Sequence, residues 1–150
     1  LGGESSGGLK IRGHVNGKDG ILAALLAVEM LAKTGKSLSQ LLAEINEKYG
    51  TLYFGEVNLR YHPQDRTRLD QILIKDKYTP KLPWRLAKTS YMDGVKFYFT
   101  NDNWFSIRFS GTEPILRLAY ETNTPKEAKE LKAAVFSDNY LNLPIPEGEI

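Results

Sequence analysis

The stretch WFSIRFSGTEPILRLAYE, residues 104–121, decides the fold. Apolar and polar side chains alternate over WFSIRF and again over ILRLAYE, and the turn-forming SGTEP separates the two runs. Since successive side chains of a strand point to opposite faces, the pattern predicts two strands, each with one face on a core. The residues expected on that core face are Phe105, Ile107, Phe109, Leu116, Leu118 and Tyr120.

The residues around this stretch predict further strands and two helices. GVKFYFT, residues 94–100, alternates in the same way, and TLYFGEVNLRY, residues 51–61, also has the pattern of a strand. Apolar spacing predicts a short helix around residues 69–73, followed by a proline-marked connection at residues 80–83. A capping box with proline at the first helical position predicts a last helix over residues 124–135. The second half is therefore expected to be α+β, an antiparallel sheet with two covering helices.

The first fifty residues predict two more helices. Asp19 is a suitable N-cap for a helix that ends near Gly35, and the apolar residues of this helix lie on several faces. Ser37 and Gln40 form a capping box for a second helix, which Gly50 closes. Because a helix that is apolar on several faces needs cover, we expect it in an α/β domain whose sheet is not in this chain. The expected domains are residues 1–49 and 50–150, taken from a longer protein.

Composition limits the classes of function. The 150 residues include 20 basic and 18 acidic ones, so the formal net charge is only +2. No broad basic field is then available to hold a nucleic acid or a membrane surface. With no cysteine and two histidines, the chain has too few ligands of the usual kind for a structural zinc site. The longest apolar run, residues 21–32, is too short to cross a bilayer, and we expect a cytoplasmic protein.

The SGTEP turn has the composition of an anion site. Arg108 and Arg117 are expected on the non-core face of their two strands, and both would flank Ser110-Gly111-Thr112 if the strands pair. Guanidinium groups match phosphate oxygens, hydroxyl groups add donors, and a glycine turn lets backbone N–H groups converge on an anion. A plain turn between strands is the alternative interpretation, and Glu113 weakens the anion site unless its side chain turns away.

The opening GGESSGG, residues 2–8, lacks the spacing of either nucleotide-binding glycine motif. Its distinguishing residue is Glu4, a carboxylate near Ser6 in a loop where glycines permit close backbone approach. Such a carboxylate accepts hydrogen bonds from neighbouring sugar hydroxyls. Taken alone, the stretch is more typical of a flexible linker.

The two loops together resemble a known family. GGESSGG followed by GKDGILAALLAVEMLA, a second helix, a hinge and later WFSIRFSGTEPILRLAYE is similar to the C-terminal portion of the α-D-phosphohexomutases, the phosphoglucomutase and phosphomannomutase family. The resemblance covers nearly the whole chain. It implies residues 1–49 as the end of a third domain and residues 50–150 as a fourth domain with a layout like that of the TATA-binding protein.

The resemblance also implies an activity. Enzymes of this family move a phosphoryl group between the 1 and 6 positions of a hexose phosphate through a bisphosphorylated sugar. A phosphoserine and a Mg²⁺ ion held by an Asp-Gly-Asp loop carry out the transfer, and neither loop is in this chain. The implied partners are a hexose phosphate and the remaining domains of the enzyme, with no nucleic acid and no membrane.

Site roles follow from the same resemblance. Glu4 and Ser6 would contact sugar hydroxyls, while the phosphate that is not transferred would be held by Arg108, Ser110, Gly111, Thr112 and Arg117. No catalytic or metal-binding residue is expected in this chain. Several members of the family carry His where Gly8 stands, so the preferred hexose is left open. His14 is assigned no role, and Lys18 and Asp19 are read as a helix start.

Two other classes of function stay open. Tyr98 and Trp104 are expected on the polar face of the sheet, where aromatic rings could stack on the bases of a single-stranded nucleic acid. The near-zero net charge weighs against that function. The remaining class is an interaction domain without a ligand.

Overall fold

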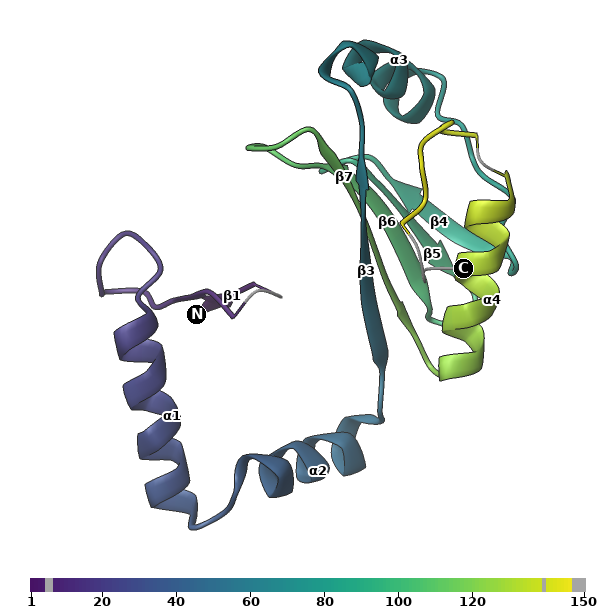
Figure 1. The fold of residues 1–150 in the computed structure, drawn as a ribbon. Coiled ribbons are helices and arrows are strands. Elements are labelled where there is room, and N and C mark those ends of the chain that lie inside the picture. Colours follow the sequence, from purple (N-terminus) through teal and green to yellow (C-terminus); the bar gives the residue numbers. More distant parts are fainter. Residues whose placement is uncertain (5–6, 139, 147–150) are drawn as a thin grey trace. The chain divides into compact units, whose positions relative to one another are not determined.

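The computed structural model describes residues 1–4, 7–138 and 140–146. The chain divides into two compact units, Leu1–Gly50 and Thr51–Ile150, and each is described by itself (Figure 1). In the first unit, strand β1 (Gly2–Gly3) pairs antiparallel with β2 (Leu9–Lys10). Two helices follow, α1 (Gly20–Thr34) and α2 (Leu38–Tyr49).

The predicted ends of both helices are confirmed. The Asp19 carboxylate accepts hydrogen bonds from the backbone N–H groups of Ile21 and Leu22, both at 3.0 Å. Gly35 ends α1 with a φ of 66°, a left-handed conformation that glycine adopts without a steric penalty. Helix α2 begins with the complete capping box of Ser37 and Gln40. The limits of these helices are therefore set by local hydrogen bonds.

The apolar side chains of α1 lack cover among the described residues. Ile21, Leu25 and Val28 are 78%, 62% and 63% exposed, and the described part of the chain buries no residue of α1 or α2. A helix of this composition is stable in water only when its apolar surface is covered. That surface remains available for packing, and its place in an α/β layer remains a prediction.

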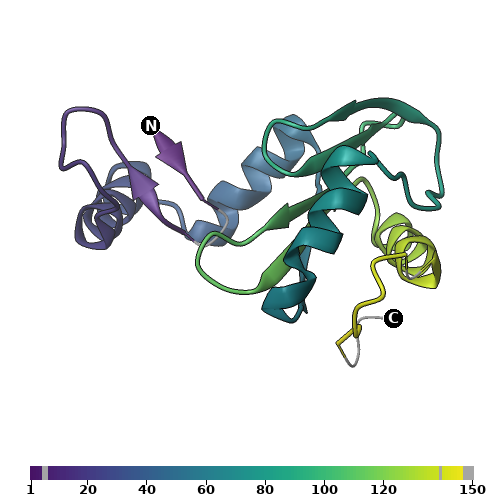
Figure 2. The same cartoon turned by 90° about the horizontal axis from the view of Figure 1, so that it is seen from above.

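The second unit, seen from above in Figure 2, is built on an antiparallel sheet. The sheet has five strands in the order β3-β7-β6-β5-β4. The strands are β3 (Tyr53–Arg60), β4 (Leu86–Ser90), β5 (Val95–Phe99), β6 (Trp104–Phe109) and β7 (Ile115–Thr122). Strands β6 and β7 pair with Ile107 opposite Leu118. The hairpin predicted from the stretch at residues 104–121 is thus confirmed.

Helices cover one face of this sheet. A short 3₁₀ turn (Pro63–Asp65), α3 (Arg66–Asp70) and a π-helical turn η2 (Gln71–Lys75) follow β3, and α4 (Pro125–Asp138) follows β7. Leu69 and Leu73 from the first group and Leu131 and Val135 from α4 share one core with the sheet. The sheet supplies most of the rest of that core: Val57, Leu59, Val95, Phe97, Phe99, Phe105, Ile107, Leu116 and Leu118. The α+β class with an antiparallel sheet is confirmed.

Strand β4 is the one element of this sheet that the sequence analysis missed. It lies at the edge, pairs only with β5, and contains a register shift between Leu86 and Lys88. Its five residues, LAKTS, include no buried side chain and no alternation of apolar and polar residues. Because the signal for a strand in sequence is that alternation, an irregular edge strand leaves none to detect.

Candidate functional site

The two arginines of the predicted phosphate loop lie side by side. Arg108 on β6 is directly opposite Arg117 on β7, so both leave the sheet on the non-core face, as the alternation predicted. Two like charges directly opposite each other on neighbouring strands destabilise a sheet. The arrangement therefore needs negative charge nearby, from the protein or from a ligand.

Carboxylates of the same unit supply part of that charge. Arg108 Nη1 donates to Asp93 Oδ2 at 3.1 Å, and Arg117 Nη1 lies 3.9 Å from Glu56 Oε1. Arg108 and Asp93 are 51% and 74% exposed, and exposed ion pairs of this kind contribute about 0–1 kcal/mol. An anion that makes several hydrogen bonds can therefore compete for these guanidinium groups.

The loop between the arginines is held by backbone hydrogen bonds. Ser110 N–H donates to the carbonyl of Ile115 at 2.8 Å, and the Pro114 carbonyl accepts from Tyr61 N–H at 3.1 Å. The Ser110 hydroxyl is 3.5 Å from the Thr112 hydroxyl. A side chain added at Gly111 would meet no atom within 4 Å, so the backbone there is open to approach. The loop is a fixed turn with two hydroxyl groups and one open glycine.

The opening loop of the first unit is also defined by hydrogen bonds. Glu4 N–H donates to the Gly8 carbonyl at 2.9 Å, and Gly7 N–H donates to the Glu4 carbonyl at 3.0 Å. The Glu4 carboxylate forms an ion pair with Lys18 Nζ. Ser6, the other predicted sugar-contacting residue, lies outside the described residues.

An open pocket of about 560 Å³ adjoins Glu4. Its lining is rich in glycine and carries two lysines: Gly2, Gly3, Glu4, Gly8, Lys10, Gly17 and Lys18. The sequence analysis read Lys18 only as part of a helix start, whereas its side chain lines this pocket. In the sequence, Lys18 stands between Gly17 and the N-cap Asp19. A lysine next to a glycine in a loop is the sequence feature that could have indicated a pocket here.

His14 and Asp19 contact each other at the start of α1. His14 Nε2 is 2.7 Å from Asp19 Oδ2, and this hydrogen bond, followed by that from Leu22 N–H, lowers the pKa of Asp19. The aspartate therefore stays charged where it caps α1. His14, which was assigned no role, is placed here as a partner of the helix cap.

The two rings of the nucleic-acid alternative are opposite each other on β5 and β6, on the non-core face. Lys96 Nζ lies 3.6 Å from the ring centre of Trp104, and Lys88 Nζ lies 4.5 Å from that of Tyr98. Trp104 Nε1 also donates to Glu121 at 3.0 Å. Lysines of the same chain thus occupy positions over both rings, where a stacked base would have to lie.

Among the described residues, neither a metal-binding group nor a membrane-spanning helix is found. In the part of the chain that the structure describes, no three His, Cys, Asp or Glu side chains are grouped so that they could hold a metal ion. The described helices are all too short or too polar to cross a membrane.

Comparison with known proteins gives matches over both units. Residues 1–49 match the family model described as phosphoglucomutase/phosphomannomutase, alpha/beta/alpha domain III. Residues 56–137 match the model described as phosphoglucomutase/phosphomannomutase, C-terminal domain.

Individual relatives have related names. A phosphoglucomutase/phosphomannomutase of Thermococcus kodakarensis is 31% identical over 87% of this chain and 26% of its own length. A phosphomannomutase/phosphoglucomutase of Pseudomonas putida is 31% identical over 88% of this chain and 27% of its own. A phosphoglucosamine mutase of Listeria monocytogenes is 30% identical over 95% of this chain and 28% of its own. The chain thus spans about a quarter of the length of these relatives.

Proposed function

The chain belongs to the phosphoglucomutase/phosphomannomutase family, and we propose that it is the substrate-binding portion of a phosphohexomutase. The complete enzyme would interconvert hexose 1- and 6-phosphates of glucose or mannose through a bisphosphorylated sugar. Residues 1–49 would be the C-terminal part of domain III, with the sugar-binding loop. Residues 50–150 would be domain IV, with the phosphate-binding loop.

The observation that carries this proposal is the cross-strand position of Arg108 and Arg117 beside an open turn. Their guanidinium groups would hold the phosphate that is not being transferred, with donors from Ser110, Gly111 and Thr112. Charge-assisted hydrogen bonds from guanidinium groups contribute about 1.5–3 kcal/mol each, more than the exposed ion pairs they would replace. A phosphate with two negative charges also relieves the repulsion between the two arginines.

Glu4 and Ser6 would contact the sugar hydroxyls in domain III. A carboxylate accepts hydrogen bonds from two neighbouring hydroxyls at once, which fixes the orientation of a sugar ring. The ion pair with Lys18 would orient the Glu4 carboxylate at the pocket that both residues line. Ring orientation would decide which end of the sugar phosphate meets the reacting groups.

Mg²⁺ would be bound elsewhere in the complete enzyme, and its role there would be to stabilise charge on the phosphoryl group in transfer. The residues present do not fit a magnesium site, because the described part of this chain groups no three suitable ligands. The residues of this chain would bind and orient the substrate.

Chemical-shift mapping by NMR tests whether the loop at Ser110, Gly111 and Thr112 binds a phosphate. The ¹⁵N-labelled 150-residue chain is titrated with glucose 1-phosphate, with glucose, and with a single-stranded oligonucleotide at constant ionic strength. The amide signals of Ser110, Gly111 and Thr112 are expected to move with the sugar phosphate and to stay in place with glucose. Equal shifts with glucose would contradict a phosphate site. Shifts centred on Tyr98 and Trp104 with the oligonucleotide alone would favour the nucleic-acid alternative.

A further inference from the structure

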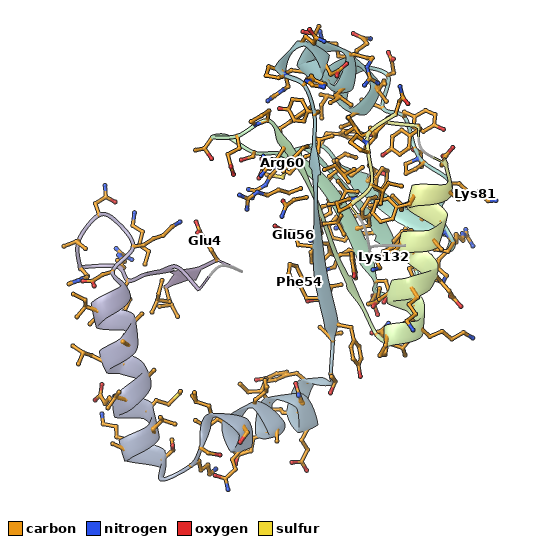
Figure 3. The ribbon with its side chains drawn as sticks, viewed as in Figure 1. Glu4, Phe54, Glu56, Arg60, Lys81 and Lys132 are labelled. Carbon is orange, nitrogen blue, oxygen red and sulfur yellow. The ribbon has the colours of Figure 1, made fainter. Side chains whose placement is uncertain are left out.

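Arg60, the last residue of β3, projects from the same face of the sheet as the phosphate loop arginines. The intervening residues Val57 and Leu59 are buried in the core, so Glu56, Asn58 and Arg60 point away from it. Figure 3 shows Arg60 and Glu56 leaving β3 on the same side. The sequence gives no sign that Arg60 lies near the loop, because this position depends on which strand β3 pairs with.

The register of β3 with β7 places Arg60 next to the loop. Arg60 is opposite Ile115, the residue that follows Pro114, and Asn58 is opposite Arg117. Arg60 and Arg117 are therefore diagonal neighbours on one face, a relation that typically separates residues by about 7–8 Å, within reach of two long side chains.

The other arginines near the loop have side-chain partners in the protein, and Arg60 has none among the described residues. Arg108 is paired with Asp93 and Arg117 with Glu56, while the Arg66 guanidinium stacks on Phe109 at 3.7 Å. Within the described ranges, the guanidinium of Arg60 has neither an ion-pair nor a hydrogen-bond partner in the protein. Arg108 and Arg117 are thus each paired with a carboxylate, whereas Arg60 is not.

We propose that Arg60 is a third guanidinium ligand of the phosphate that binds at this loop. This inference rests on the proposed function of the Arg108 loop and adds a residue to it. A guanidinium is always charged and presents up to five N–H donors, so an exposed, unpartnered one beside two others favours a doubly charged ligand. Because Asp93 and Glu56 partly offset the charges of Arg108 and Arg117, Arg60 would add to the attraction for the anion.

The test compares dissociation constants for glucose 1-phosphate, measured from loop amide shifts of the 150-residue chain at constant ionic strength. Arg60→Gln is expected to weaken binding about three- to tenfold, since it removes a charge-assisted contact at an exposed site. Arg60→Lys, which keeps the charge without the planar fork, is expected to give an intermediate loss.

Arg85→Gln is the matched control. It makes the same charge change on an exposed arginine of the same unit, beside Thr100 at the opposite end of β6 from the loop. Its effect should stay below about twofold, as expected for a distant charge screened by salt.

The outcomes separate a failure of the Arg60 role from a failure of the proposed function. If Arg60→Gln binds as Arg85→Gln does while Arg108→Gln loses most of its affinity, the role of Arg60 is refuted and the proposed function stands. If the loop amides of the unsubstituted chain do not respond to the sugar phosphate, both are refuted. An unfolding curve for each variant shows whether a loss of binding is a loss of fold.

Discussion

Single residues outside the proposed phosphate loop set the position of β6, the strand that carries Arg108. Gly94 precedes β5 and has a φ of 74°, and a Cβ added there would lie 2.3 Å from the Ile107 carbonyl oxygen and 3.0 Å from Arg108 Cα. Both contacts are to backbone atoms of β6, which cannot move aside cheaply. The neighbouring Asp93 forms the ion pair with Arg108 of β6.

Gly94→Ala is therefore expected to lower the free energy of unfolding by about 2–4 kcal/mol, combining left-handed strain with overpacking. Gly111→Ala is the control, because the added Cβ there meets no atom within 4 Å, and its effect should stay within about 0.5 kcal/mol. Urea unfolding of both variants measures the difference. Equal stabilities would show that the turn before β5 relaxes away from β6.

At the scale of elements, the start of α1 depends on the charge of Asp19. Its pKa is lowered, first by the hydrogen bond from His14 and then by that from Leu22 N–H. A carboxyl group with a lowered folded pKa stabilises the folded state fully above its ordinary value near 3.8, and loses that effect as the pH falls through the lowered value.

Two observations check this expectation. A carboxyl ¹³C titration should give Asp19 a pKa below its ordinary value, and the amide signals of Ile21 and Leu22 should change over the same pH range. His14→Ala should move that pKa upward, because it removes the largest cause. Asp19→Asn keeps a capping oxygen and should abolish the pH dependence. An Asp19 that titrates at or above its ordinary value would contradict the described cap.

An element could be predicted from the sequence when the residues that pair in it lie close together along the chain. The β6–β7 hairpin and the caps at Asp19 and Ser37 were predictable, because their hydrogen bonds join residues close in sequence. The position of Arg60 beside the loop and the pairing of Glu56 with Arg117 were not, since both follow from β3 pairing with β7 about sixty residues later. Alternation shows which face a residue occupies, but it does not name the neighbouring strand.

At the scale of the whole molecule, we expect the 150-residue chain to bind a hexose phosphate without converting it. The sequence contains neither the serine loop that donates the phosphoryl group in the family nor an Asp-Gly-Asp loop for Mg²⁺. An assay with glucose 1-phosphate, glucose 1,6-bisphosphate and Mg²⁺ should show no glucose 6-phosphate above the blank. Turnover that requires Mg²⁺ and persists through repeated purification would show that the reacting groups are in this chain.

The central claim is that Arg108 and Arg117 hold one phosphate together, and a double-substitution cycle tests it most directly. Dissociation constants for glucose 1-phosphate are measured for Arg108→Gln, Arg117→Gln and the double variant, with Arg85→Gln as the control. Each single substitution should weaken binding about tenfold, and the double variant should lose less than the product of the two, because a phosphate released by one arginine is held poorly by the other. Losses no larger than that of Arg85→Gln, or losses that multiply as at two independent sites, would contradict a shared phosphate.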